Sequence, residues 1–269
     1  MSDKTQIHTA MTIAGSDSGG GAGLQADMKT FAANGVYSST VITAVTAQNT
    51  LGVHKVMDLP LDIIEAQIVA TLSDIGADAV KTGMLSSPEI IKCVAENLAK
   101  YKNEKLVVDP VMVAKGGASL ISEPAIEVLK ETLIPMSTIV TPNAPEAGVL
   151  TGIDVLDLDS AREAAVALIK MGARAAVVKG GHFDGGPATD VFYDGQEFRT
   201  FTTRRIVTEN THVTGCTFAS AIAAGVAKGE SLREAVSNAK VYVTGAIKSD
   251  FDIGSGHGPL NHFHEYWNL

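Results

Sequence analysis

Short apolar runs alternate with amphipathic segments along most of the chain. Runs rich in Val, Ile and Thr predict strands, and apolar positions at a spacing of three and four residues predict helices. The predicted strands cover 11–15, 37–47, 53–59, 79–84, 105–112, 137–141 and 175–179, with two short segments within 188–201 joined at Asp194-Gly195. The predicted helices cover 22–34, 60–73, 87–102, 124–133, 144–151, 160–171, 217–228 and 231–248.

This alternation predicts a three-layer α/β fold, in which helices cover both faces of a mostly parallel central sheet. We find no internal linker, repeat or low-complexity segment, so residues 1–269 are expected to form a single domain. Ligands in such folds bind outside the carboxyl ends of the strands. Polar or glycine residues stand at six of the predicted strand ends, namely Gly15-Ser16-Asp17, Gln48, Gly83-Met84, Asp109, Asn143 and Lys179.

The stretch from Asn210 to Ser220 joins a polar loop containing Gly215 to an apolar helical pattern. The N–H groups of the first helical turn have no partner within a helix, and with the helix dipole they attract an anion such as phosphate. Cys216 would lie at this helix start, where the pKa of a thiol is expected to fall. The alternative interpretation is that Gly215 only starts the helix and that Cys216 is a small buried residue.

Composition narrows the classes of partner. The formal net charge is −9, and no Lys/Arg run is present, so a nucleic-acid partner is not expected. No apolar run is long enough to span a membrane, and residues 1–10 lack the apolar region of a signal peptide. The two cysteines, Cys93 and Cys216, suit a reducing compartment better than a disulfide scaffold, so a cytoplasmic location is expected.

Three residues at strand ends suit a nucleoside triphosphate. Asp109 and Glu146 are candidate Mg²⁺ partners, because Mg²⁺ prefers oxygen ligands and keeps several waters. Lys179 can bring a positive charge to a phosphoryl group in transfer. Other interpretations stay open at this point: a helix cap for the aspartate, an exposed helix acid for the glutamate and a surface position for the lysine.

A dinucleotide-binding enzyme is the main competing hypothesis, because residues 21–26 satisfy G-x-G-x-x-A. The loop between the predicted strand and the first glycine of that motif is too long for a dinucleotide-binding turn. The next strand ends at Ala47-Gln48-Asn49, without the acid that would bind a ribose. A Walker phosphate loop, G-x-x-x-x-G-K-[ST], is also absent from the sequence. A kinase with this sequence would therefore need a different phosphate site.

Seven segments, taken in order, closely resemble the hydroxymethylpyrimidine/phosphomethylpyrimidine kinases of thiamine biosynthesis, within the ribokinase-like superfamily. They are Thr12–Asp27, Ala47–Thr50, Lys81–Met84, Asp109–Met112, Thr141–Ala147, Lys179–His182, and Asn210–His212 with Thr214–Thr217; the ending Gly258–His264 is also similar. The resemblance covers nearly the whole chain. It implies a ribokinase-like fold and two ATP-dependent phosphorylations, first of 4-amino-5-hydroxymethyl-2-methylpyrimidine and then of its monophosphate.

The resemblance also implies roles for individual residues. Gln48 matches the position that binds the pyrimidine, and Gly23, Met84 and Val111 match positions that line the substrate pocket. Asp109 and Glu146 match the Mg²⁺ and phosphate region, and Asn143 and Lys179 match the nucleotide-binding positions. Val213, Thr214, Gly215 and Cys216 match the anion hole, with Cys216 as the catalytic residue beside Lys179. ATP and Mg²⁺ are the implied cofactors, and a homodimer is the implied assembly.

One position departs from the family pattern Asn-Thr-His-Gly-Thr-Gly-Cys, since Val213 replaces its first glycine. Glycine in an anion loop usually supplies a positive φ or a close backbone approach, and a β-branched residue adopts a positive φ only at high cost. Two further hypotheses stay open. One is a pyridoxal kinase on the same fold, and the other is a non-catalytic pyrimidine-binding relative.

Overall fold

The computed structural model describes residues 7–113, 120–181, 186–206, 214–249 and 252–267. Its strands are β1 (Thr9–Asp17), β2 (Tyr37–Asn49), β3 (Gly52–Asp58), β4 (Ala79–Thr82), β5 (Leu106–Val108), β6 (Ile139–Val140), β7 (Ala176–Val178), β8 (Ala188–Tyr193) and β9 (Phe198–Thr203). Its helices are α1 (Gly23–Ala33), α2 (Leu61–Asp74), α3 (Pro88–Lys100), α4 (Glu123–Glu131), α5 (Leu133–Met136), α6 (Ala144–Thr151), α7 (Leu158–Lys170), α8 (Thr214–Ala227) and α9 (Leu232–Lys248).

The described strands form one nine-stranded sheet in the order β3-β2-β1-β4-β5-β6-β7-β8-β9. The strands from β2 to β7 in this order are parallel, while β3 at one edge and β8 and β9 at the other run antiparallel to their neighbours. The parallel strands therefore bring their carboxyl ends to one side of the sheet, where ligands bind in α/β folds.

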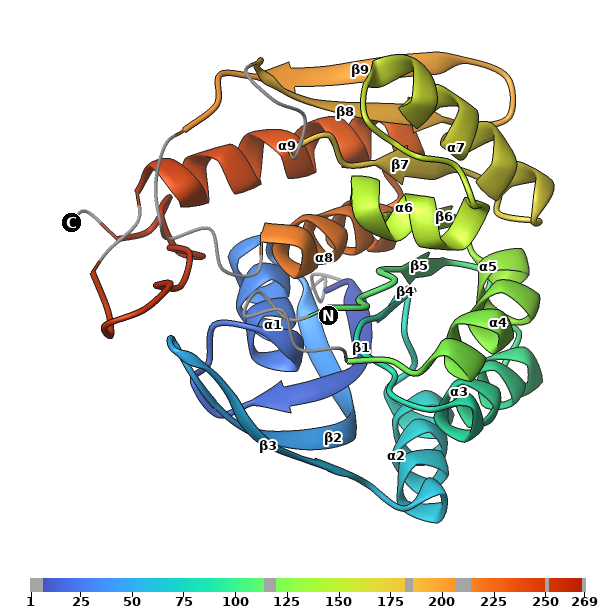
Figure 1. The fold of residues 1–269 in the computed structure, drawn as a ribbon. Helices are drawn as coiled ribbons and strands as arrows, with labels where there is room; N and C mark the ends of the chain where they lie inside the picture. Colours follow the sequence, from blue (N-terminus) through green and yellow to red (C-terminus); the bar gives the residue numbers. More distant parts are fainter. Residues whose placement is uncertain (1–6, 114–119, 182–185, 207–213, 250–251, 268–269) are drawn as a thin grey trace, which may run out of the picture.

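Helices cover both faces of the sheet, as the alternating pattern predicts (Figure 1). One core cluster packs the sheet against α2, α3, α4, α5, α6 and α7, and the other packs it against α1, α8 and α9. Helix α8 is buried from Thr217 to Ala227, on all of its sides. An apolar helix of this kind belongs inside the protein rather than on its surface, so the start of α8 is held in place by packing along the whole helix.

Among the elements whose boundaries differ from the prediction, three have a clear local feature at the point of difference. Strand β5 ends at Val108, before Asp109 and Pro110, since proline has no N–H to continue a strand ladder. The single helix predicted over 124–133 is two helices, because Pro135 cannot donate the hydrogen bond that would continue α4. Helix α8 begins at Thr214 rather than Thr217, so Thr214 to Cys216 form its first turn.

The predicted hairpin between β8 and β9 is confirmed. Asp194 Oδ1 accepts hydrogen bonds from the backbone N–H groups of Gln196 (2.9 Å) and Glu197 (2.8 Å), and Gly195 has φ +86°. Aspartate followed by glycine favours such a turn, because the carboxylate binds nearby N–H groups and glycine tolerates a positive φ.

Candidate functional site

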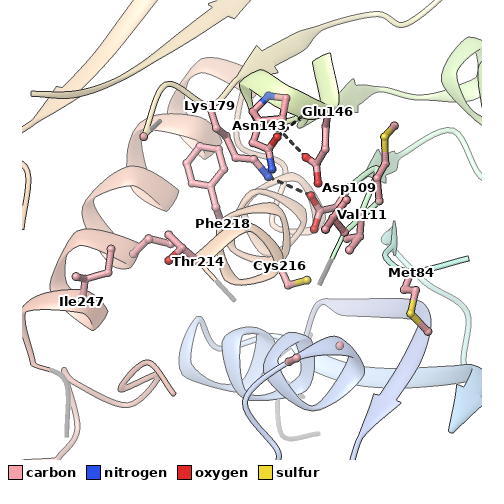
Figure 2. A pocket seen from close by; sticks show the side chains of 18 of the residues that line it. Met84, Asp109, Val111, Asn143, Glu146, Lys179, Thr214, Cys216, Phe218 and Ile247 are labelled. Atoms are coloured by element: carbon pink, nitrogen blue, oxygen red, sulfur yellow. Dashed lines mark hydrogen bonds and ion pairs between the residues drawn. The ribbon is translucent and has the colours of Figure 1, made fainter. Parts of the chain in front are cut away.

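A cavity of about 940 Å³ lies at the carboxyl ends of the parallel strands (Figure 2). Each predicted site residue that the structure describes contributes to its lining: Gly23, Gln48, Met84, Asp109, Val111, Asn143, Glu146, Lys179, Thr214, Gly215 and Cys216. Val213 lies outside the described residues. Side chains far apart in the sequence therefore meet around one space large enough for two small ligands.

The glycine-rich loop between β1 and α1 is organised by Asp17. Its carboxylate accepts hydrogen bonds from the backbone N–H groups of Gly19 (2.8 Å), Gly21 (3.0 Å) and Ala22 (2.7 Å). Gly23 follows with φ +52°, and a Cβ there would overlap the carbonyl oxygen of Gly15. Only glycine fits this position without a shift of the backbone, so Gly23 allows α1 to begin directly at the cavity wall.

Lys179 and Asp109 form an ion pair beside the cavity. Lys179 Nζ donates to Asp109 Oδ1 at 3.2 Å, and the side chains are 14% and 2% exposed. Burial works to lower the pKa of Lys179, but Asp109 and Glu146 outweigh it, so the pKa is raised. Burial works to raise the pKa of Asp109, but Lys179 and Lys81 outweigh it, so the pKa is lowered. Both groups are therefore charged at neutral pH, and the lysine does not occupy a surface position.

The second oxygen of Asp109 differs from the first in its surroundings. Oδ2 is buried and has no hydrogen-bond partner among the described residues, although the Cys216 side chain is close enough to help lower the pKa of Asp109. No described helix is capped by this side chain, so the alternative interpretation of Asp109 as a helix cap is wrong. A buried carboxylate oxygen without a donor is costly unless a ligand satisfies it.

Asn143 and Glu146 form a capping box at the start of α6. Asn143 Oδ1 accepts from the Glu146 N–H at 2.8 Å, and Glu146 Oε2 accepts from the Asn143 N–H at 2.8 Å. Glu146 is only 8% exposed, so its interpretation as an exposed helix acid is wrong. Burial raises the pKa of Glu146 to about 7; Lys179 opposes this rise and Asp109 adds to it. This carboxyl group therefore keeps its proton to a higher pH than an ordinary glutamate does.

The first turn of α8 lies directly against the lysine. Thr214, Gly215 and Cys216 all line the cavity, and a Cβ on Gly215 would stand 3.0 Å from Lys179 Nζ. Figure 2 shows Lys179 pointing toward Asp109, with Cys216 at the start of α8 beside them. An ammonium group and the first turn of a helix thus converge on one place, which is a suitable arrangement for a phosphoryl group.

The pKa of Cys216 differs from the sequence-based expectation. Burial raises the pKa of the thiol above its ordinary value; Lys81 and Lys179 oppose this rise, while Asp109 and Asp27 add to it. The expected lowering by the helix start is therefore wrong for this structure. Two buried carboxylates lie near the thiol, and a sequence pattern does not place them there.

Gln48, Met84 and Val111 form another part of the cavity wall. The backbone of Gln48 is fixed by Ser18, whose Oγ accepts from the Gln48 N–H at 2.8 Å and donates to the Gln48 carbonyl oxygen at 2.7 Å. Thr46 Oγ1 lies 3.2 Å from Gln48 Oε1, and its single proton is shared between this oxygen and the Ser16 carbonyl oxygen at 2.9 Å. An oriented amide beside apolar side chains is suited to a small polar ring.

Several residues that line the cavity cannot be recognised as site residues from the sequence. At another part of the cavity wall, Lys240 Nζ donates to Asp190 Oδ2 at 2.7 Å, and Asp190 Oδ1 accepts from the Gly180 N–H at 3.1 Å. The aspartate thereby fixes the residue that follows Lys179. Val243, Thr244 and Ile247 of α9 also line the cavity. The helical spacing of these three residues indicates only that they share a helix face. The role of Asp17 in organising the loop, in contrast, could have been predicted from its position before a glycine-rich stretch.

In the described part of the chain, no helix is both long and apolar enough to cross a membrane.

A family model described as phosphomethylpyrimidine kinase matches residues 17–261. The chain belongs to this family. It is 50% identical over 258 residues to the hydroxymethylpyrimidine/phosphomethylpyrimidine kinase of Bacillus subtilis, a match that covers 96% of this chain and 95% of that one. The expected relationship and the expected kinase class are therefore confirmed.

The chain is also similar to two further proteins. The thiamine biosynthesis bifunctional protein ThiED of Geobacter sulfurreducens is 52% identical over 254 residues, but the chain spans only 52% of its length. A Bacillus subtilis pyridoxal kinase, solved as an ADP complex, is 39% identical with a TM-score of 0.92, covering 98% of this chain and 100% of that one. The expected ribokinase-like α/β fold is thus confirmed, with pyridoxal kinase as a structural relative.

Proposed function

We propose that this chain phosphorylates the hydroxymethyl group of 4-amino-5-hydroxymethyl-2-methylpyrimidine with ATP, and then phosphorylates the monophosphate to the diphosphate. The observation that carries the proposal is the convergence of Lys179, Asp109 and the first turn of α8 on one cavity, within a family of phosphomethylpyrimidine kinases. We also propose that residues 1–269 act as one kinase domain, which the single continuous sheet supports.

Gln48 is proposed to bind the aminopyrimidine ring. A side-chain amide offers an acceptor and two donors, which match the mixed edge of such a ring. Thr46 holds the amide oxygen and Ser18 holds the backbone, so the group is oriented before substrate binds. Met84 and Val111 supply apolar surface for the ring faces, and Gly23 leaves room beside it.

The N–H groups of Thr214, Gly215 and Cys216 are proposed to bind the oxygens of the transferring phosphoryl group. Lys179 adds a positive charge within the same space, since its ammonium group lies against Gly215. Donors that are already in place stabilise the charge that develops in the transition state, without reorganisation during the reaction. Asn143 is proposed to bind nucleotide beside Lys179, because the two residues are bridged in the backbone.

Mg²⁺ is proposed to bind between Asp109 and Glu146. The buried Oδ2 of Asp109 has no hydrogen-bond partner among the described residues, and Glu146, whose pKa is raised, can supply a second oxygen once it loses its proton. Groups of three or more His, Cys, Asp or Glu that could hold a metal are not found in the described part of the chain. This donor set fits Mg²⁺, which is usually held by one or two carboxylates plus phosphates and waters. When bound, it would offset the charge of the nucleotide phosphates.

Cys216 is proposed to be the base of the first phosphorylation only. An alcohol must lose its proton as it attacks, whereas the monophosphate oxygen of the second step is already largely ionised. Because the pKa of Cys216 is raised, thiolate is the minor form at neutral pH. The first step is therefore expected to accelerate as the pH rises above neutrality.

The direct test incubates the protein with the aminopyrimidine alcohol and Mg-ATP and follows products by mass. A monophosphate followed by a diphosphate is expected, and Lys179→Met is expected to remove both products; circular dichroism verifies its fold, because the change leaves buried Asp109 without this counter-charge. Ligand-dependent thermal stabilisation without product would instead indicate a binding protein. Faster phosphorylation of pyridoxal than of the pyrimidine would favour the activity of the structural relative.

Val213→Gly restores the glycine of the family pattern and is informative in the same assay. A large rise in turnover would mean that valine hinders the anion hole. Unchanged turnover would mean that the loop binds phosphate with an ordinary backbone conformation at this position.

A homodimer in the cytoplasm is proposed as the working state. Four large apolar side chains of the β2–β3 hairpin, Val45, Leu51, Val56 and Met57, are exposed, which is the composition of a contact surface. Light scattering after size exclusion, on the wild type and on Met57→Glu, tests the dimer. Two unpaired thiols suit a reducing compartment, and cell fractionation tests the location.

A further inference from the structure

The segment Asp252–Trp267, here named the C-terminal strap, packs against the turn between β2 and β3 (Figure 1). The Gly256 N–H donates to Thr50 Oγ1 at 3.2 Å, and the His257 N–H donates to the Thr50 carbonyl oxygen at 3.0 Å. Thr50 is two residues beyond Gln48, the proposed pyrimidine-binding residue. The strap therefore fixes the end of the hairpin that carries this residue.

Two glycines permit this contact. A Cβ on Gly256 would overlap the carbonyl oxygen of Thr50, and a Cβ on Gly254, where φ is +80°, would overlap the Thr50 side chain. Any larger residue at Gly256 must move the strap or the turn, because its closest neighbour is backbone rather than a flexible side chain.

The other end of the strap contacts α8 at the residue that follows the proposed anion hole. His262 Nε2 lies 3.1 Å from Thr217 Oγ1, and both residues are buried. Tyr242 of α9 donates its hydroxyl to the His262 carbonyl oxygen at 2.6 Å. Burial, with a smaller effect from Lys29, lowers the pKa of His262 to about 4, so the ring is neutral near pH 7 and can share one hydrogen bond with Thr217. Thr217 directly follows Cys216 in α8.

The strap thus links the β2–β3 turn, two residues beyond Gln48, to α8 at the residue after Cys216. The β2–β3 hairpin lies at the sheet edge and most of β3 is exposed; Ser18 bonds to Gln48 on one side of the hairpin end, and the strap bonds to Thr50 beyond it. Helix α8, in contrast, is fixed by packing along its length. A link from α8 to the hairpin end is therefore able to set the position of Gln48 relative to the phosphoryl-binding turn.

We propose that the C-terminal strap is a positioning element that sets the distance between Gln48 and the first turn of α8, and thereby favours the pyrimidine alcohol as a substrate. This inference rests on the proposed function. The alcohol reaches the phosphoryl-binding turn only through its ring contacts, so a displaced Gln48 weakens its binding directly. The monophosphate carries an additional phosphate with its own binding contacts, so it depends less on that distance.

Gly256→Ala is the variant that tests the strap. Steady-state kinetics are measured separately with the alcohol and with the monophosphate, at saturating Mg-ATP. We expect the KM for the alcohol to rise about tenfold with kcat little changed, and the KM for the monophosphate to change less than about threefold. Gly186→Ala is the matched control, because a Cβ there meets nothing within 4 Å, and it is expected to behave as the wild type.

His262→Gln and His262→Leu test the other end of the strap. Glutamine retains a polar group near the position of Nε2 and is expected to keep most of the wild-type KM for the alcohol. Leucine loses the bond to Thr217 and is expected to shift KM in the same sense as Gly256→Ala. Circular dichroism and thermal unfolding verify that each variant is folded.

Equal changes for both substrates, or a loss of thermal stability with unchanged KM values, would show that the strap is only structural. Should the wild type phosphorylate neither substrate, the proposed function fails, and calorimetric binding of the alcohol to the same variants then tests the strap. Equal binding by wild type and Gly256→Ala, or no binding at all, would overturn the strap proposal as well.

Discussion

Lys81 and Asp27 form an ion pair with both side chains fully buried. Lys81 Nζ lies 3.0 Å from Oδ1 and 2.9 Å from Oδ2 of the aspartate. Thr12 donates to the same carboxylate at 2.5 Å and Ser220 at 2.6 Å, so β1, α1, β4 and α8 meet at one charged group. Burial works to lower the pKa of Lys81, but Asp27 and more distant acids outweigh it and raise the pKa, so the lysine is charged.

Removing one charge of this pair is expected to destabilise the protein more than removing both charges together. Lys81→Met leaves a buried carboxylate without its counter-charge and should cost roughly 3–5 kcal/mol of unfolding free energy. Asp27→Asn with Lys81→Met removes both charges and should cost less than the sum of the two single changes. Urea unfolding of the four proteins measures the coupling. Additive losses would mean that the two charges do not interact.

Glu146 should make the metal-free protein less stable as the pH rises through the pKa that this residue has in the folded state. That pKa is about 7 in the folded protein, against an ordinary value of 4.5. Between these values the folded state binds more protons than the unfolded state, so the stabilisation is full below about pH 4.5 and is lost above about pH 7.

Glu146→Gln removes this titration while keeping the size of the side chain. Its stability relative to wild type should therefore increase between pH 4.5 and 8, by roughly 3 kcal/mol. Urea unfolding in the presence of a chelator measures the difference at each pH. Glu163→Gln, at an exposed acid of α7, is the control and should show no such change; a flat difference for Glu146→Gln would contradict the raised pKa.

Substitutions at Gly23 and Gly35 can distinguish the cost of a steric overlap from the cost of a positive φ. Both have a positive φ, +52° and +72°, but a Cβ on Gly23 would overlap the carbonyl oxygen of Gly15, whereas a Cβ on Gly35 meets nothing within 4 Å. Gly35→Ala should cost about 1–2 kcal/mol through backbone conformation alone. Gly23→Ala should cost more and should also weaken pyrimidine binding. Thermal unfolding and calorimetry compare the two variants, and equal effects would remove the steric argument.

Cys216→Ala should affect the two phosphorylations unequally. The loss of a positioned base is expected to reduce kcat for the alcohol about 10²–10⁴-fold, while the already ionised monophosphate should lose much less. The residual rate with the alcohol should also become less dependent on pH above neutrality. Separate assays with each substrate give the ratio. Equal reductions would mean that Cys216 acts on the phosphoryl group common to both steps.

Local patterns predicted much of the fold and the cavity lining. The strand-end residues Asp109, Asn143 and Lys179 follow short apolar runs, and parallel strands bring such ends together whatever the details of packing. The Asp194-Gly195 hairpin follows from turn chemistry alone. These features depend on residues close together in the sequence, which is why one sequence sufficed to predict them.

Features that depend on residues far apart in the sequence were either not predicted or predicted wrongly. The thiol pKa of Cys216 depends on burial and on Asp109 and Asp27, which lie on other elements. The pair of Asp190 and Lys240 joins β8 to α9, and neither residue stands out in a periodic pattern. Lys81 and Asp27 belong to segments that resemble the kinase family, but the sequence indicates no contact between them. Electrostatic environment is a property of the assembled fold rather than of a motif.

The bond between Ser220 and Asp27 also has a consequence for the order of assembly during synthesis. From β4 onward each strand is added to the same side of the sheet in the order in which it is translated. Ser220, however, follows Asp27 by 193 residues. The N-terminal part of the sheet must therefore leave the ribosome with Asp27 and Lys81 not yet covered by α8. Contacts between such distant residues form late, so the cavity at the strand ends is completed only when nearly the whole chain has been made.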